Sequence, residues 1–172
     1  MAQIRLSKMN MDNPPNSVLC GVSSIDNQIR DAYSRTLFKQ AVAYNVLVDG
    51  NLVGNCMIRL VWLCDETSEY YVGDSQFIAL EISYIAIDRR FQRKGIGTRV
   101  LQMLLQEARR LSEIWPVRFL VLDAFCEKED WYTSAGFKRY PKVRDLRYPG
   151  TVPMRIDLID IAAAEGYAES LV

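Results

Sequence analysis

The sequence predicts a single α+β (mixed α/β) domain, in which helices pack on a mostly antiparallel sheet. Three observations lead to this fold class. The chain has 172 residues, of which 49% are hydrophobic and 24% charged, and this is ordinary globular composition with enough chain for one core. Two β-rich runs flank Asp49-Gly50, and further on a nearly continuous apolar strand leads directly into a helical pattern. We therefore expect one domain over residues 1–172, with 162–172 a C-terminal tail or short helix.

The first part of the chain is predicted to hold one helix among three strands. Ile4–Met9 has the composition of a first strand. Ser23-Ser24-Ile25-Asp26 resembles a capping box with Asp in place of Glu, and it predicts a helix that runs to about Gln40. Ala41–Val48 and Leu52–Leu63 are rich in β-formers, and the Asp-Gly pair between them predicts a hairpin.

The middle of the chain is predicted to be a loop, a buried strand and a long helix. Residues 65–75 are acidic, and we expect a solvated connection there rather than a lid. Ile78–Asp88 is predicted to be a central strand covered on both faces. Apolar residues then repeat at helical spacing, so the helix should bury one stripe in the core. The stripe consists of Val100, Leu101, Leu104, Leu105, Ala108 and Leu111.

The last part is predicted to add a buried strand, a short helix and two closing strands. Val117–Phe125 has the apolar composition of the buried strand. Asp130–Ala135 suits a short helix that stops at Gly136, because glycine readily takes the left-handed conformation after a helix end. Phe137–Tyr140 and Val152–Ile161 are the candidate closing strands.

Composition excludes several classes of function. Lys+Arg and Asp+Glu number 21 each, so nothing global calls for nucleic acid or an anionic membrane. No stretch reaches the ~18 apolar residues of a membrane span, and the N-terminus lacks a signal-peptide core. We therefore expect a cytoplasmic protein.

The cysteines and the missing histidines limit the chemistry further. The four cysteines are scattered, without C-x-x-C spacing, and we expect free buried thiols rather than disulfides or zinc ligands. The chain has no histidine, which excludes Ser-His-Asp and Cys-His triads. Proton transfer is left to carboxylate, tyrosine, thiol, lysine or water.

The clearest functional signal is a strand-to-helix junction that carries Gly95-Ile96-Gly97. A helix start has unpaired backbone N–H groups and the positive end of the helix dipole, and glycines let an anion come close to them. Five basic residues surround the junction, namely Arg89, Arg90, Arg93, Lys94 and Arg99. This combination suits a diphosphate, and a tight turn with solvated basic residues is the alternative. The third glycine of a dinucleotide motif and the Lys-Ser/Thr of a P-loop are both missing.

Gln92-Arg93-Lys94-Gly95-Ile96-Gly97 matches Arg/Gln-x-x-Gly-x-Gly/Ala, the acetyl-CoA diphosphate motif of the GNAT superfamily of N-acetyltransferases. The chain resembles this family over residues 78–140 and less closely over 17–63. The resemblance implies acetyl-CoA as donor and a twisted sheet of six to seven strands whose central strands splay apart. It also implies the cofactor contacts: Ile85, Ala86 and Ile87 beside the pantetheine arm, and Gln92, Arg93, Lys94, Gly95, Ile96, Gly97 and Thr98 in the turn.

The resemblance also supplies two catalytic candidates. Trp131–Phe137 is similar to the family's Tyr-x-x-x-Gly-Phe, which implies that Tyr132 lies near the CoA sulfur and protonates the departing thiolate. A packed tyrosine without a catalytic role is the alternative. Glu81 stands where some GNAT enzymes place a catalytic base, and an apolar strand would raise the pKa of its carboxyl group. A solvated Glu81, with water as the base, is equally open. A backbone N–H at Ala86 or Ile87 would polarise the carbonyl.

The acceptor is less clear from the sequence. Cys20-Gly21, Ile25-Asp26 and Ala32 resemble a Cys-Gly…Leu-Asp…Ala pattern of toxin–antitoxin GNAT proteins, as does the strand Arg155–Leu158. That resemblance implies aminoacyl-tRNA as acceptor and a small DNA-binding antitoxin as partner. A tRNA-binding protein should carry a broad basic surface, and this chain is neutral overall.

The first hypothesis is therefore acetyl transfer to a primary amine of a small molecule or peptide. The tRNA-directed toxin is the second hypothesis, and a non-catalytic CoA-binding sensor is the third. The family resemblance also makes a homodimer an expectation.

Overall fold

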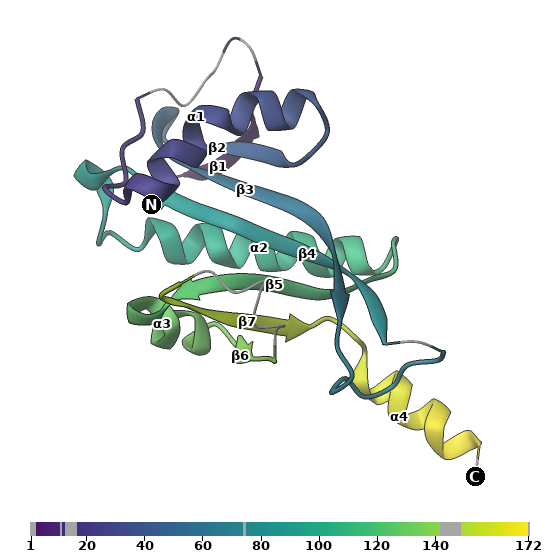
Figure 1. Cartoon of the computed structure of the whole chain (residues 1–172). Helices are drawn as coiled ribbons and strands as arrows, with labels where there is room; N and C mark the ends of the chain where they lie inside the picture. The colour runs from purple at the N-terminus through teal and green to yellow at the C-terminus, as the bar shows by residue number, and fades with distance from the viewer. Residues whose placement is uncertain (1–2, 11, 13–16, 74, 142–148, 172) are drawn as a thin grey trace. The chain divides into compact units, whose positions relative to one another are not determined.

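The computed structural model describes residues 3–10, 12, 17–73, 75–141 and 149–171 (Figure 1). These residues form seven strands, hydrogen-bonded in the order β1-β2-β3-β4-β5-β7-β6. β4 and β5 pair in parallel, while the β1–β2, β2–β3, β5–β7 and β6–β7 pairs are antiparallel. The predicted α+β class with a mostly antiparallel sheet is confirmed. The strands are β1 (Ile4–Lys8), β2 (Val42–Val48), β3 (Asn51–Cys64), β4 (Gln76–Ile87), β5 (Val117–Phe125), β6 (Lys138–Arg139) and β7 (Thr151–Asp157). The helices are α1 (Ser23–Leu37), α2 (Ile96–Ser112), α3 (Glu129–Ser134) and α4 (Ile161–Ser170).

The chain divides into two compact units. The first unit comprises Met1–Leu60 and Ile82–Gln106, and the second comprises Val61–Glu81 and Glu107–Val172. β3, β4 and α2 each contribute residues to both units. The single domain expected over residues 1–172 stays a prediction.

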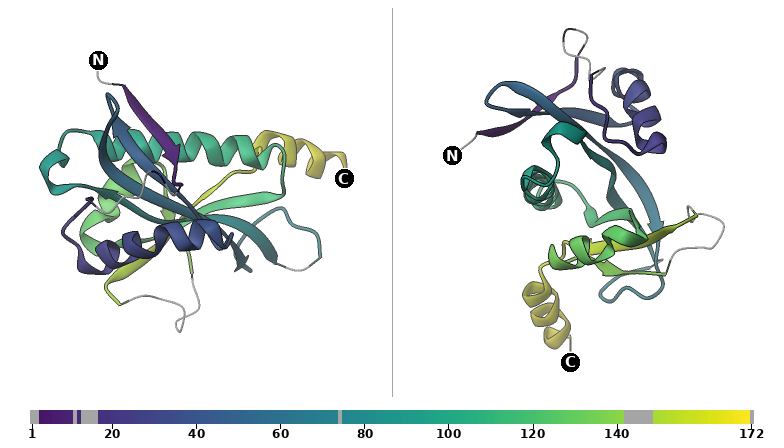
Figure 2. Two further views of the ribbon diagram at one scale, coloured as in Figure 1. Left: turned by 90° about the horizontal axis from the view of Figure 1, so that it is seen from above. Right: turned by 90° about the vertical axis from the view of Figure 1, so that its left-hand side faces the viewer.

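In the first unit, α1 packs on the β2–β3 hairpin and the second half of β4. Ile29 and Ala32 of α1 belong to one buried cluster with Ala43, Met57 and Tyr84 of the strands. The right-hand view of Figure 2 shows α1 and α2 on opposite sides of these strands. The predicted hairpin is confirmed: Asp49 and Gly50 have φ of 48° and 83°, and two positive φ values are what a type I′ turn requires.

The start and end of α1 differ from the prediction. The helix begins at Ser23, its N-cap position is Val22, and no side chain caps it, so the predicted capping box is wrong. The carboxylate of Asp26 instead accepts the backbone N–H groups of Cys20 and Gly21, at 2.9 and 3.2 Å. The helix ends at Leu37, three residues before the expected Gln40.

In the second unit, β5 is the central strand, with β7 and the first half of β4 on either side. Its core includes Leu63, Ala79, Phe119, Val121 and Tyr140. α3 is Glu129–Ser134, shifted by one residue from the expected Asp130–Ala135, and Gly136 follows its C-cap with a φ of 97°. Two closing strands are shorter than expected: β6 has two residues, and β7 ends at Asp157 rather than Ile161. Asp160 then caps α4 by accepting the N–H of Ala163 at 3.1 Å.

Two arginines anchor the connection between β3 and β4 to the sheet of the second unit. The guanidinium of Arg118 donates to both carboxylate oxygens of Asp157, at 2.7 and 2.8 Å, and to the carbonyls of Glu69 and Tyr70, at 2.8 and 2.9 Å. Arg155 forms an ion pair with the buried Asp65. The described residues of 65–75 are therefore a loop, as predicted, but one with fixed attachment points.

None of the helices in the described part of the chain has both the length and the apolar character that a membrane span requires.

Candidate active site

The turn from β4 to α2 places glycine where the backbone needs it. Gly95 has a φ of 76° and Arg93 a φ of 58°, both in the left-handed region. α2 begins at Ile96, so Gly97 lies in its first turn, where backbone N–H groups lack partners within the helix. A Cβ built on Gly95 would meet nothing within 4 Å, so the space beside this glycine is open. The turn therefore has the features that a diphosphate needs.

Asp88 holds the beginning of this turn. Its buried carboxylate accepts the backbone N–H of Arg90 at 3.0 Å and two bonds from the Arg90 guanidinium, at 2.8 and 3.2 Å. The hydrogen bonds from Arg90 lower the pKa of Asp88 to about 2. The carboxylate is thus charged throughout the neutral range and keeps Arg90 in place.

Gln92 is exposed, yet its side-chain amide is hydrogen-bonded to the backbone. Its amide Nε2 donates to the carbonyl of Ile87 at 2.8 Å and to the carbonyl of Cys20 at 2.9 Å. The predicted contact of Gln92 with the cofactor stays a prediction. In the structure, both of its side-chain N–H groups donate to backbone carbonyls.

The five basic residues of the turn are all exposed. Lys94 lies 5.4 Å from the ring centre of Phe91, and Arg99 donates to the Gln102 side chain at 3.3 Å. The guanidinium of Arg89 lies against Gly21, where an added Cβ would come within 2.4 Å of the arginine Nε. Arg93 and Lys94 precede α2 and Arg99 lies in its first turn, so three exposed cationic residues flank the start of this helix.

The end of β4 lies close to β3. A Cβ on Gly54 would meet the carbonyl oxygen of Ala86 at 2.4 Å and Ile87 Cδ1 at 2.9 Å, so only glycine fits there. The N–H of Asp88 donates to the carbonyl of Val53 at 2.9 Å. Ile85, Ala86 and Ile87 therefore lie on a strand end that is packed closely on one side.

A buried polar network next to this strand was not foreseen. The Tyr84 hydroxyl donates to Asn55 Oδ1 at 2.5 Å, and Asn55 Nδ2 donates to the Tyr44 carbonyl at 2.8 Å and to Asn45 Oδ1 at 3.3 Å. Tyr84 is 4% exposed, and both asparagines are fully buried. Burial raises the pKa of Tyr84, so its hydroxyl stays neutral and keeps its proton for the hydrogen bond. The signal in the sequence is only two asparagines inside β-rich runs.

Tyr132 lies on α3 in the second unit. Its ring meets Phe137 edge to face at 5.7 Å and Trp131 at 4.6 Å. Burial raises the pKa of Tyr132 to about 12. Among the residues that the structure describes, none hydrogen-bonds its hydroxyl. The side chain is thus a neutral phenol whose proton is not committed to a described partner.

Glu81 is half-buried and pairs with Val121 at the last β4–β5 register position. The structure adds two neighbours that sequence reasoning missed, Tyr140 and Asp123. Burial raises the pKa of Tyr140, and the charges of Asp123 and Glu81 raise it further. The charges of two carboxylates thus help to keep one buried tyrosine of this unit protonated.

All four cysteines are free thiols, as predicted, but only Cys56 is buried. Burial raises the pKa of Cys56 to about 12 and that of Cys20 to about 11, so both thiols stay protonated. Cys64 and Cys126 are exposed, which corrects the expectation of burial for these two.

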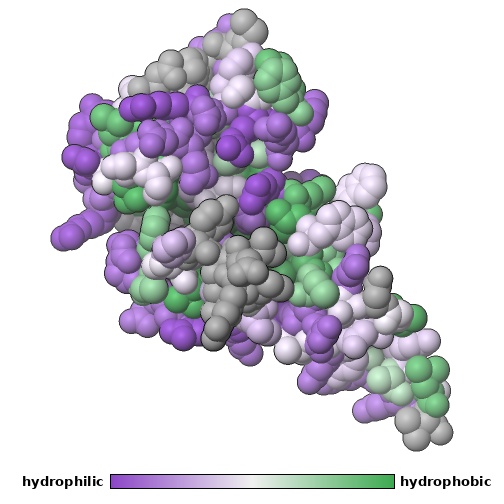
Figure 3. Space-filling view, viewed as in Figure 1, coloured by the Kyte–Doolittle hydropathy of each residue, from purple (hydrophilic) through white to green (hydrophobic). Residues whose placement is uncertain are grey.

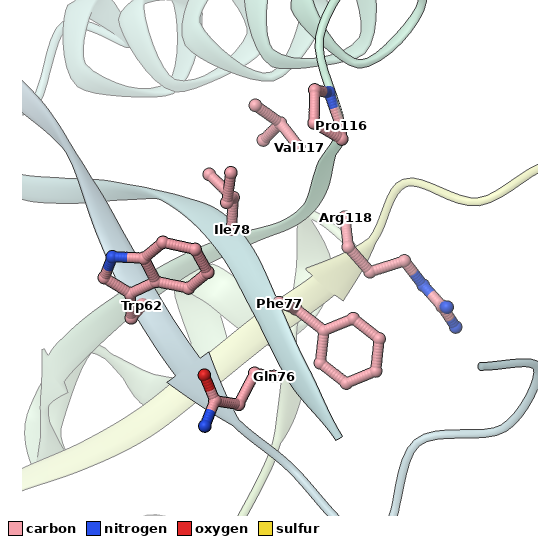
Figure 4. A pocket seen from close by; sticks show the side chains of 7 residues that line it. All are labelled: Trp62, Gln76, Phe77, Ile78, Pro116, Val117 and Arg118. Atoms are coloured by element: carbon pink, nitrogen blue, oxygen red, sulfur yellow. The ribbon is translucent and has the colours of Figure 1, made fainter. Parts of the chain in front are cut away.

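A pocket of about 430 Å³ lies elsewhere in the second unit (Figure 4). None of the predicted site residues lines it. Its lining residues are Trp62, Gln76, Phe77, Ile78, Pro116, Val117 and Arg118.

The family assignment agrees with these features. The model of the acetyltransferase (GNAT) family matches residues 12–137, so the chain belongs to this family. It is a GNAT N-acetyltransferase that takes its acetyl group from acetyl-CoA, as the motif at the β4–α2 turn predicted.

Several solved structures share the fold. A bacterial toxin is similar with a TM-score of 0.76 and 19% identity, over 96% of this chain and 97% of that one. A tyrosine-to-phenylalanine variant of KacT is similar with a TM-score of 0.75 and 13% identity, over 96% of this chain and 99% of that one. AtaT complexed with acetyl-methionyl-tRNAfMet is similar with a TM-score of 0.74 and 14% identity, over 95% of this chain and 98% of that one. At these identities the likeness shows the fold alone. A search of curated proteins found no relative of this chain.

Proposed function

We propose that this enzyme acetylates the amino group of an aminoacyl-tRNA. The observation that carries the proposal is the distribution of charge. The first unit has eleven Lys and Arg against five Asp and Glu, a net charge of +6, while the second has ten against sixteen, a net charge of −6. The overall neutrality that favoured a small amine in the sequence analysis therefore hides one strongly basic unit, and a polyanion is the acceptor such a unit attracts.

The basic side chains of the first unit are accessible. Nine of its eleven are exposed. Three of its five carboxylates already accept hydrogen bonds: Asp88 from Arg90, and Asp26 and Asp49 from backbone N–H groups. On the face shown in Figure 3, hydrophilic side chains cover much of this unit, whereas apolar side chains appear along α4. The exposed basic residues are Arg5, Lys8, Arg30, Lys39, Arg89, Arg90, Arg93, Lys94 and Arg99.

The diphosphate of acetyl-CoA is proposed to bind at the start of α2. Backbone N–H groups at Ile96, Gly97 and Thr98 would receive its oxygens, and Arg93 and Lys94 would balance its charge. The pantetheine arm would pair with the backbone of Ile85–Ile87, with a strand N–H at Ala86 or Ile87 polarising the thioester carbonyl.

The transfer step balances with the chain's own residues. The neutral amine attacks the thioester carbonyl, so that a C–N bond forms and the C–S bond breaks. The amine proton passes to Glu81 or to water, and the Tyr132 hydroxyl gives its proton to the departing thiolate. Tyr132 suits the acid because its phenol is neutral near pH 7 and no other described residue takes its proton in a hydrogen bond, although burial raises its pKa to about 12 and makes it a weaker donor.

The toxin structures support the same acceptor. AtaT was solved with acetyl-methionyl-tRNAfMet, and also with the C-terminus of the antitoxin AtaR and acetyl-CoA. Their fold spans almost the whole of this chain. The proposal includes an antitoxin partner and a cytoplasmic location, where charged tRNA and acetyl-CoA meet.

A small cationic amine is the second candidate, because the second unit carries a net charge of −6 and two of its carboxylates, Glu81 and Asp123, lie near Tyr140. Such an amine would be attracted to carboxylates rather than to the basic unit.

The deciding experiment follows labelled acetyl transfer to charged tRNA, uncharged tRNA, polyamines and free amino acids at 50 to 200 mM salt. We expect transfer to charged tRNA only. With three phosphate contacts, log(kcat/KM) should fall against log[salt] with a slope of about −2 to −3. Efficient transfer to a polyamine, with no salt dependence of this size, would reject the tRNA proposal in favour of the second candidate.

A further inference from the structure

We infer that Gln92 is a positioning residue that joins the cofactor turn to the segment before α1, and that acetyl-CoA affinity depends on this junction. The inference rests on the proposed function, since it assumes that acetyl-CoA binds at the turn. Gln92 Nε2 carries two N–H bonds and uses them on two carbonyls, those of Ile87 in β4 and Cys20 before α1. One planar group thus joins two segments that are 67 residues apart in the chain, at Cys20 and Ile87.

The segment Leu19–Gly21 is fixed to the same turn at further points. The N–H of Leu19 donates to Asp88 Oδ2 at 3.4 Å, and the N–H of Arg89 donates to the Leu19 carbonyl at 3.1 Å. Gly21 lies beneath the Arg89 guanidinium, where a Cβ would be 2.4 Å from Nε. Side chains and backbone of the turn therefore hold three consecutive residues.

Asp26 completes the arrangement from the side of α1. It accepts the N–H groups of Cys20 and Gly21. These hydrogen bonds outweigh the effect of burial and lower the pKa of Asp26, and the charge of Arg89 lowers it further. The Cys20-Gly21…Asp26 pattern noted in the sequence thus has a physical role: glycine leaves room for Arg89, and the aspartate accepts two backbone N–H groups. The same segment is the one that Gln92 and Arg89 contact.

The junction matters because the turn beyond Gln92 is conformationally demanding. Two of the next three residues, Arg93 and Gly95, have positive φ, and a non-glycine residue such as Arg93 enters that region only when its surroundings require it. α2 fixes one end of the turn, and Gln92 fixes the other. Without the Gln92 bonds, the amides at the start of α2 would meet a less ordered loop, and ordering it on binding would cost affinity.

The geometry also defines which side chains could replace glutamine at position 92, and arginine is the nearest match. Both side chains end in a planar group with several N–H donors, and both can serve two carbonyls. Glutamate has the same shape as glutamine but only acceptors, and it would face two carbonyl oxygens. Methionine has similar length and offers no donor.

The experiment compares three exposed-site variants by calorimetry with acetyl-CoA and by hydrogen exchange. Gln92→Met should weaken acetyl-CoA binding by about tenfold, as expected for the loss of two modest hydrogen bonds, and Gln92→Glu by more. Gln92→Arg should stay within about twofold of the wild type because it restores the donors. The Arg89 and Cys20 amides should exchange faster in Gln92→Met and not in Gln92→Arg, while the melting temperature stays near that of wild type. Gln106→Met, at an exposed glutamine of α2, is the matched control and should leave both readouts unchanged.

Unchanged affinity or unchanged exchange in Gln92→Met overturns the inference, as does a Gln92→Arg variant no better than Gln92→Met. Gly97→Val separates this failure from that of the proposed function. If Gly97→Val abolishes acetyl-CoA binding while Gln92→Met does not weaken it, the proposed acetyl-CoA site is retained and the positioning role of Gln92 is rejected. If a folded Gly97→Val binds like wild type, the cofactor site itself is wrong.

Discussion

Removing the Tyr84 hydroxyl should destabilise the first unit measurably. Tyr84→Phe keeps the ring in its buried place and deletes the donor that lies 2.5 Å from Asn55 Oδ1. Asn55 is fully buried, so its carbonyl oxygen would lose its described donor with no access to water. Leaving such a group unsatisfied costs about 1–3 kcal/mol. For a chain of this length, ~2 kcal/mol corresponds to a melting temperature about 4–8 °C lower.

The assay is thermal and urea unfolding followed by circular dichroism. Tyr33→Phe is the matched control, because Tyr33 packs on the same cluster and its hydroxyl has no hydrogen bond among the described residues. It should change stability by less than about 0.5 kcal/mol. If Tyr84→Phe and Tyr33→Phe lose the same amount, the hydroxyl at position 84 contributes nothing specific and the network is not what stabilises this strand.

Three further predictions concern the site. Gly97→Val should abolish acetyl-CoA binding in a folded protein, since a branched side chain would cover the amides of the first turn; Gly166→Val, at an open position of α4, is the control for calorimetry. Tyr132→Phe should lower kcat by ~10²–10⁴-fold with acetyl-CoA affinity nearly intact, and a wild-type rate under chemistry-limited conditions would remove Tyr132 from the mechanism. Asp88 has a folded-state pKa of about 2, below its ordinary 3.8, so its contribution to stability is present above pH 4 and is lost as the pH falls towards 2. The Asp88→Asn variant should therefore be less stable than wild type at pH 7, and its free energy of unfolding should fall less between pH 4 and 2. Parallel curves of unfolding free energy against pH for the two proteins would contradict this.

Local sequence signals predicted most of the secondary structure. Asp49-Gly50 fixed the hairpin because two positive φ values favour these residues, and Gly136 ended α3 for the same kind of reason. The strand Val117–Phe125 has the bounds that its apolar composition suggested. Where the prediction went wrong, the side chain found its partners outside the expected motif. Asp26 looked like part of a capping box, yet its carboxylate serves the amides of Cys20 and Gly21 before the helix.

The candidate site was only partly predictable, because several of its contacts join residues far apart in the chain. The turn at Gly95 and the tyrosine at position 132 follow from short motifs. By contrast, Tyr84, Gln92 and Arg118 bond to Asn55, Cys20 and Asp157, which lie 29, 72 and 39 residues away in the chain. No local sequence pattern predicts these pairs. The charge separation escaped notice as well, because neither unit is a continuous stretch of sequence.

That separation has a practical consequence for handling the protein. A molecule with no net charge is expected to pass through ion-exchange resins, but one carrying +6 and −6 on different units offers each resin an oppositely charged surface. We expect retention on both cation and anion exchangers near neutral pH. The same attraction between the basic unit of one molecule and the acidic unit of another should promote reversible clustering in dilute buffer. It should fade above about 0.15 M salt, where the screening length falls to about 8 Å.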